Sequence, residues 1–116
     1  LIINGEVQYQ NLASGVNPRT AIGQREDGAV LLLVLDGRSI NTLGATMENI
    51  CDVMLEYGAV NAGNLDGGSS SVMLYRDSQG LYGPAGEVTM INNYSLLQSQ
   101  PRRMPNYWLV RSASEE

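Results

Sequence analysis

Histidine, lysine and phenylalanine are absent from this 116-residue chain, and cysteine occurs once, at Cys51. Without histidine, the chain lacks the side chain that most often serves as general base or metal ligand near neutral pH. A single cysteine excludes an internal disulfide and a cysteine-ligated zinc site. Any chemistry therefore depends on carboxylates, arginines, hydroxyl groups and the backbone.

The charge balance is acidic: 12 acidic residues against 7 basic ones give a formal net charge of −5. Every basic residue is an arginine and no basic run occurs, so the chain lacks the cationic patch that nucleic-acid binding requires. No apolar stretch is long enough to span a membrane. We therefore expect neither a nucleic-acid partner nor a membrane span, and the sequence carries no signal for oligomeric state.

The length and the apolar fraction of 43% predict one globular domain, 1–116, with a real core. Asn4-Gly5 between two short runs predicts a β-hairpin with a type I′ turn. Residues 29–35 form a near-continuous apolar run, which predicts a central strand buried on both faces. Further expected elements are strands over 20–25, 72–75 and 106–111, a long surface excursion over 81–100 and a frayed tail over 112–116.

One amphipathic helix is expected after residue 45. Thr46 is a suitable N-cap, Glu48 complements the helix dipole, and Gly58 is a suitable C-terminal stop. Met47, Ile50, Cys51 and Met54 share one face, so Cys51 is expected to be buried and inert. The predicted fold class is α+β: a mixed, mostly antiparallel sheet with one long amphipathic helix packed on it.

The stretch around which the chain is organised is residues 64–70, Asn-Leu-Asp-Gly-Gly-Ser-Ser. An acidic residue followed by two glycines predicts a sharp turn, at which a ligand can approach the main chain. Hydroxyl groups and free N–H groups on such a turn can hold an oxyanion. The alternative is an ordinary hairpin loop, because Asp-Gly is a strong turn signal.

Further polar clusters are expected at strand ends or loop starts, where a rigid scaffold usually carries binding groups. They are Asn-Pro-Arg-Thr at 17–20, Asp-Gly-Arg at 36–38, Thr-Met-Glu at 46–48 and Pro-Arg-Arg-Met-Pro at 101–105.

In kind and in order, these clusters resemble the motifs of the phosphodiester glycosidase family. That family includes bacterial proteins described as exopolysaccharide-biosynthesis-like and the animal N-acetylglucosamine-1-phosphodiester α-N-acetylglucosaminidase. The resemblance covers about residues 17–110. It implies a hydrolase that cleaves the glycosidic bond of a sugar-1-phosphodiester, with a sugar-phosphate or polysaccharide substrate and an extracellular or cell-envelope location in bacteria.

The resemblance also implies roles for particular residues. Carboxylates should stabilise an oxocarbenium-like sugar carbon, and guanidinium and N–H groups should hold the phosphate. The candidate catalytic residues are Asp66, Glu48 and Asp36; the candidate substrate-binding residues are Arg19, Thr20, Gly67, Gly68, Ser69, Ser70 and Arg102.

Four of the candidates have a simpler alternative. Asp36 and Asp66 could be turn residues that bond their own backbone, and Glu48 could be only a helix-dipole partner. Arg19 could form a structural ion pair with Asp36 or Asp66. No cofactor is expected; the same acids could bind calcium, but no recognised loop spacing is present.

The sequence departs from the family pattern in two places. Ser69 stands where many members have a third glycine, and the N-terminal Asn-Gly-Gly-x-Phe/Tyr segment of the family is absent. The chain is therefore expected to be the C-terminal part of a longer domain. This favours a second function, a non-catalytic anion- or carbohydrate-binding module that keeps the arginine and Gly-Ser cradle. A purely structural domain is a third.

Overall fold

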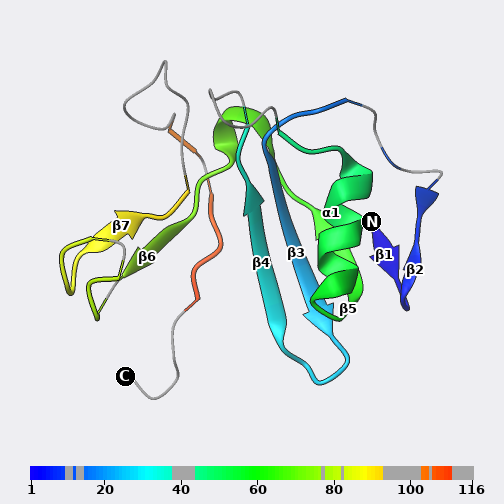
Figure 1. Ribbon diagram of the computed structural model, residues 1–116, viewed down its shortest axis with the longest axis horizontal. Helices are drawn as coiled ribbons and strands as arrows, with labels where there is room; N and C mark the ends of the chain where they lie inside the picture. The colour runs from blue at the N-terminus through cyan, green and yellow to red at the C-terminus, as the bar shows by residue number, and fades with distance from the viewer. Residues whose placement is uncertain are drawn as a thin grey trace.

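The computed structural model describes residues 1–9, 12, 15–37, 44–76, 78–81, 83–92, 103–104 and 106–110. Its strands form a five-stranded sheet in the order β2-β1-β5-β3-β4 and a separate two-stranded sheet, β6-β7 (Figure 1). The elements are β1 Ile2–Ile3, β2 Glu6–Val7, β3 Arg19–Arg25, β4 Val30–Leu35, α1 Met47–Glu56, β5 Ala59–Asn64, the 3₁₀ turn η2 Gly68–Ser70, β6 Leu74–Arg76 and β7 Val88–Met90.

The α+β prediction is confirmed, and every strand pairing in the described part of the chain is antiparallel. Helix α1 begins as expected, with Thr46 and Asn49 forming a capping box in which each side chain accepts from the other's backbone N–H. Gly58, at φ +88°, follows the helix end. The helix spans only 10 residues, so the predicted long helix is not confirmed.

The first hairpin has the predicted type I′ turn, because Asn4 and Gly5 both have positive φ, at 50° and 82°. This turn is held against β5. The Gly5 N–H donates to the Val60 carbonyl at 2.8 Å, and the Asn4 N–H donates to Asn61 Oδ1 at 3.1 Å. The hairpin thereby extends the sheet beyond β5.

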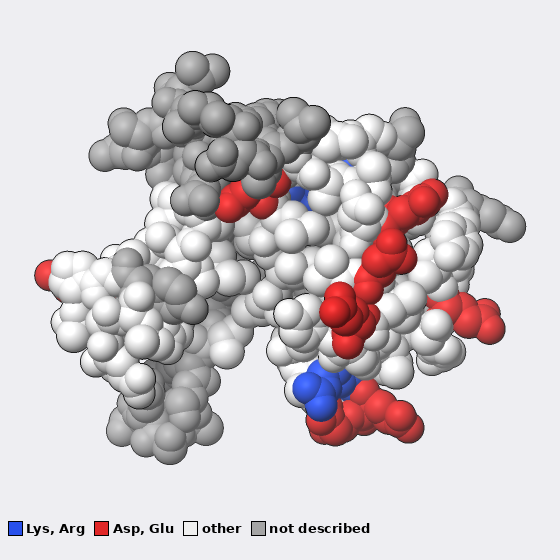
Figure 2. Space-filling view, viewed as in Figure 1, with Lys and Arg blue, Asp and Glu red and all other residues white. Residues whose placement is uncertain are grey.

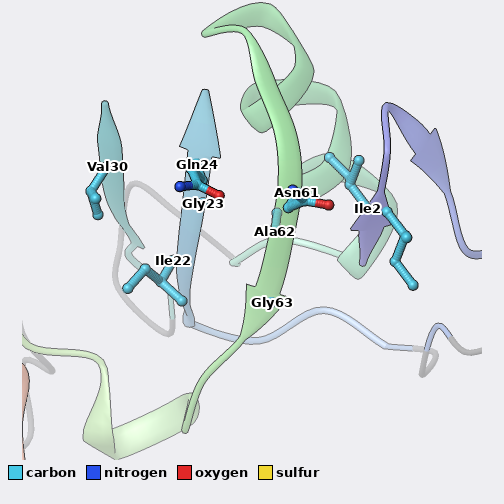
Figure 3. Close-up of a pocket in the computed structure, with 9 residues that line it drawn as sticks. Ile2, Ile22, Gly23, Gln24, Val30, Asn61, Ala62 and Gly63 are labelled. Carbon is cyan, nitrogen blue, oxygen red and sulfur yellow. The ribbon is translucent and has the colours of Figure 1, made fainter. Parts of the chain in front are cut away.

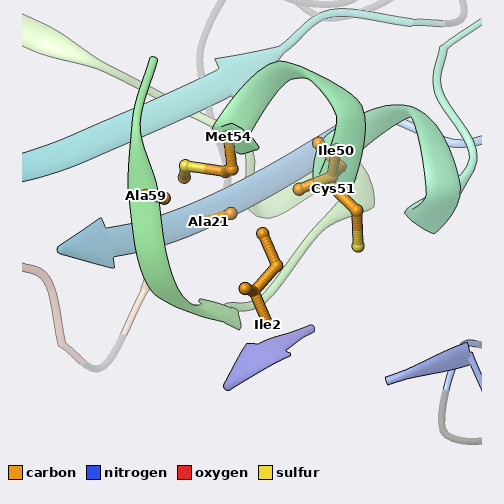
Figure 4. Packing of buried hydrophobic residues seen from close by; sticks show 6 residues of the cluster. All are labelled: Ile2, Ala21, Ile50, Cys51, Met54 and Ala59. Atoms are coloured by element: carbon orange, nitrogen blue, oxygen red, sulfur yellow. The ribbon is translucent and has the colours of Figure 1, made fainter. Parts of the chain in front are cut away.

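The core lies between α1 and one face of the large sheet (Figure 4). Gly23 leaves room for the Met54 side chain of the helix, because a Cβ there would lie 2.9 Å from Met54 Sδ. Cys51 is buried as expected, and this burial raises the pKa of its thiol, which keeps it protonated at neutral pH. Its inertness stays a prediction. The buried apolar residues of this cluster are Ile2, Ala21, Ile50, Cys51, Met54 and Ala59.

Strand β4 lies at an edge of the sheet, so the prediction of a central strand buried on both faces is wrong. Leu31 and Leu33 pack towards the core, whereas Val30 and Leu32 are 59% and 40% exposed on the other face. A continuous apolar run is compatible with either position. That other face carries an open, mainly apolar hollow across β3, β4 and β5 (Figure 3).

The predictions for the C-terminal part of the chain are confirmed only in part. The strand expected over 72–75 lies at Leu74–Arg76, and β7 pairs with it from within the expected surface excursion. The expected last strand is wrong for residues 106–110, which belong to neither sheet; Tyr107 and Trp108 are 81% and 65% exposed. Arg111 and the expected tail lie outside the described residues.

In the part of the chain that the structure describes, no helix has the length and apolar character needed to cross a membrane.

Replacing Ile50 with alanine should lower the free energy of unfolding by about 2–5 kcal/mol, because the side chain is fully buried between helix and sheet. Leu55→Ala on the same helix is the control, since Leu55 is 39% exposed and should lose less than about 1 kcal/mol. Urea unfolding of both variants measures the difference. Equal losses would contradict this placement of the core.

Candidate functional site

The antiparallel register brings three of the polar clusters to one end of the large sheet. Arg19, at the start of β3, pairs with Leu35, at the end of β4. Ala21 pairs with Asn64, at the end of β5. The segments that flank these ends, 17–20, 36–37 and 65–70, are therefore neighbours, although 46 positions separate Thr20 from Asp66 in the sequence.

The turn that follows β5 is anchored directly to β3. The Leu65 N–H donates to the Thr20 carbonyl at 2.8 Å, and the Gly68 N–H donates to the Pro18 carbonyl at 2.9 Å. Between these two bonds lies Gly67, where a Cβ would come within 2.8 Å of the Pro18 oxygen. Only a residue without a side chain allows this close approach of two backbones.

Two serines of the turn are buried. Ser71 is 2% exposed, and its Oγ accepts a hydrogen bond from Thr20 Oγ1 at 3.0 Å. Ser70 is 9% exposed, and its Oγ has no hydrogen-bond partner among the described residues. Buried hydroxyl groups are rarely left without a partner, since this costs about 1–3 kcal/mol. A bound polar ligand is one way to supply that partner.

Arg19 is buried, with 7% of its surface exposed, and it binds backbone carbonyls. Its Nε donates to Ala45 O and its Nη2 to Gly15 O, both at 3.0 Å. The alternative role of Arg19, an ion pair with Asp36 or Asp66, is not seen: within the described segments, the one ion pair is Arg25–Asp27. Arg19 therefore ties the start of β3 to the segment that leads into α1.

The three candidate carboxylates have different surroundings. Asp66 is exposed in the loop between β5 and η2. Glu48 is exposed in the first turn of α1 and belongs to an acidic band along that helix with Asp52 and Glu56 (Figure 2). Asp36 is partly buried, and its Oδ1 accepts from Asn92 Nδ2 at 3.0 Å.

The sheet itself separates some of these groups. Leu35 packs towards the helix-side core, and its partner Arg19 lies on the same side because paired residues share a face. Thr20 and Val34 consequently lie on the opposite face. Asp36, just beyond the end of β4, is linked to Thr20 on that face through Asn92 and Ser71. Arg19 and Asp36 thus approach the site from opposite faces of the sheet.

Two of the predicted site groups lie outside the part of the chain that the structure describes. Arg102 is outside the described residues, as is the side chain of Ser69. Asn92, by contrast, contacts the site, although the sequence motifs did not identify it. Its only local signal is an Asn-Asn pair in a polar segment, which is typical of many loops.

Among the described residues, no group of three or more acidic or cysteine side chains gathers in a way that could hold a metal ion.

The chain is similar to known proteins in a way that agrees with the order of its motifs. The family model described as phosphodiester glycosidase matches residues 1–111. Over 55 residues, the chain is 46% identical to the SPbeta prophage-derived uncharacterized protein YomE of Bacillus subtilis (strain 168). That match covers 47% of this chain but only 8% of the prophage protein, so the two share a small part of the latter's length.

Gly67→Ala should displace the turn and lower the free energy of unfolding by about 1–3 kcal/mol, because the new methyl group would collide with the Pro18 carbonyl. Gly63→Ala is the matched control, since a Cβ there meets nothing within 4 Å. Thermal unfolding compares the two. The close approach is refuted if Gly67→Ala is as stable as Gly63→Ala.

Arg19→Lys should destabilise the chain by about 1.5–3 kcal/mol, since lysine cannot bond both the Ala45 and Gly15 carbonyls in the same geometry. Arg25→Lys should change stability by less than about 1 kcal/mol, because its ion pair with Asp27 is exposed. Denaturant titration of both variants checks this. A neutral Arg19→Lys would show that the two buried bonds do not support the fold.

Proposed function

The chain belongs to the phosphodiester glycosidase family, and from this membership we propose that it hydrolyses a sugar-1-phosphodiester at the bond between the anomeric carbon and the phosphate oxygen. Water supplies the new hydroxyl group on the sugar, and the leaving group departs as a phosphomonoester. A phosphate is a far better leaving group than an alcohol. The site therefore has more need to hold negative charge than to donate a proton.

The observation that carries this proposal is the anchored turn after β5. It combines a buried hydroxyl without a partner among the described residues, at Ser70, with an exposed carboxylate at Asp66. A polar group that has no partner among the described residues thus lies within a few residues of a candidate nucleophile.

Each group has a proposed role. Asp66 acts as nucleophile or general base at the sugar carbon, and Asp36 or Glu48 supplies the second carboxylate. Ser70 Oγ binds the phosphate oxygens together with the N–H groups of the turn other than those of Gly68, Ser70 and Ser71, which already donate to backbone carbonyls. Arg19 contributes positive charge to the site, while two of its N–H groups remain bonded to carbonyls. Arg102 is proposed to bind the phosphate as well.

A second candidate function is an anion- or carbohydrate-binding module without turnover. The distribution of the acids favours it: Asp36 lies on the sheet face away from α1, whereas Glu48 lies on α1 itself. Glycosidases need two carboxylates that flank the same bond. Substrate binding without hydrolysis by the unmodified protein would support this module.

The substrate class and the location of the protein are also proposals. A glycan or glycoconjugate with sugar-1-phosphate linkages is the substrate class that the proposed chemistry suits. An extracellular or cell-envelope location in a bacterium, inferred from the resemblance, stays a prediction.

Asp66→Asn should reduce kcat/KM by about 100-fold or more on a methyl phosphodiester of glucose 1-phosphate or N-acetylglucosamine 1-phosphate, because it removes the carboxylate charge. Its melting temperature should stay unchanged, since Asp66 is exposed. Asp52→Asn, an exposed acid on α1, is the control and should keep full activity. Turnover that survives Asp66→Asn would sink the assignment of Asp66.

A further inference from the structure

We propose that Asn92 is a positioning residue for this site: its side-chain amide fixes the Asp36 carboxylate relative to the turn after β5. The inference rests on the proposed function, because it treats Asp36 as one of the working carboxylates. Asn92 was not among the residues that the motifs identified.

The Asn92 amide makes three hydrogen bonds, all within the normal range of donor–acceptor distances. Its Nδ2 donates to Asp36 Oδ1 at 3.0 Å and to the Ser71 carbonyl at 2.9 Å. Its Oδ1 accepts from the Met73 N–H at 2.8 Å. Both protons of the amide nitrogen and one lone pair of its oxygen are therefore engaged.

These bonds join segments that are distant in the sequence. Asp36 follows β4, and Ser71 follows η2 and bonds Thr20 of β3 through its hydroxyl. Met73 leads into β6, and the neighbouring Ile91 N–H donates to the Met73 carbonyl at 2.9 Å. Asn92 thus bonds to the segment that follows β4 of the large sheet and to the segment that leads into β6 of the small sheet.

The pattern of donors and acceptors also determines which way the amide faces. A reversed amide would place its oxygen against the Asp36 carboxylate and the Ser71 carbonyl, and its nitrogen against the Met73 N–H. Two of the contacts would then place an acceptor against an acceptor, and the third would place a donor against a donor. An aspartate at this position could not replace Asn92, because it has no donor and its charge would repel Asp36.

A merely structural role is the competing explanation. An isolated two-stranded sheet is marginally stable, and Asn92 could serve only to tether β6-β7. The two roles differ in one respect. A tether affects the site independently of Asp36, whereas a positioning residue acts through Asp36, so its effect disappears once that carboxylate is removed.

The test is a double-mutant cycle with Asn92→Ala and Asp36→Ala, measured as kcat and KM on the methyl phosphodiester of a sugar 1-phosphate. We expect Asn92→Ala to lower kcat by about 10- to 100-fold, by analogy with the loss of a partner that orients a metal-ligating side chain. KM should change much less. The double variant should be no slower than Asp36→Ala alone.

Asn61→Ala is the matched control, because the Asn61 side chain also binds a backbone N–H, that of Asn4, at a hairpin remote from Asp36. It should leave kcat unchanged. The proposal is overturned if the effects of Asn92→Ala and Asp36→Ala multiply, or if Asn92→Ala changes only the melting temperature.

A second measurement does not depend on turnover. In ¹⁵N NMR spectra, the Asn92 side-chain NH₂ signals should exchange slowly with water and should shift in Asp36→Ala. Absence of turnover by the unmodified protein, with these signals as expected, refutes the proposed hydrolysis but retains the Asn92–Asp36 contact. Fast exchange and no shift would refute the positioning role itself, whatever the activity.

Discussion

Two backbone hydrogen bonds at the start of β3 hold the site together. The carbonyl groups of Thr20 and Pro18 accept from the N–H groups of Leu65 and Gly68, and the chain between them passes so close that position 67 has no room for a side chain. The register of β5 on β3 therefore determines where Asp66 and the two buried serines lie. Because strand register follows from which face is buried, the small core beneath α1 also positions the site.

Local rules predicted much of the frame. The type I′ turn at Asn4-Gly5 and the helix start at Thr46 depend on neighbours in sequence, and both are confirmed. The placement of β4 depends on the whole sheet. An apolar run does not distinguish a central strand from an edge strand with one face on the core. Asn92 was missed for the same reason: its partners are 19, 21 and 56 residues away.

The structure also changes how Arg19 should be regarded. The motif predicted that Arg19 binds the phosphate of the substrate. In the structure its guanidinium binds two backbone carbonyls and joins β3 to the segment before α1. A buried arginine in this position has a structural role even without substrate. Its substitution cannot by itself separate binding from folding, so the acids and the turn are the more informative part of the site.

The most direct test of the central claim, that the turn after β5 binds the phosphate of a sugar-1-phosphodiester, is a ¹⁵N NMR titration with such a diester. The amide signals of Gly67, Gly68 and Ser70 should move and saturate, while that of Gly28, in the hairpin loop at the other end of β3, stays in place. The same sugar without phosphate should leave all four unchanged. Shifts confined to other regions, or no saturable shift in the turn, would contradict the claim.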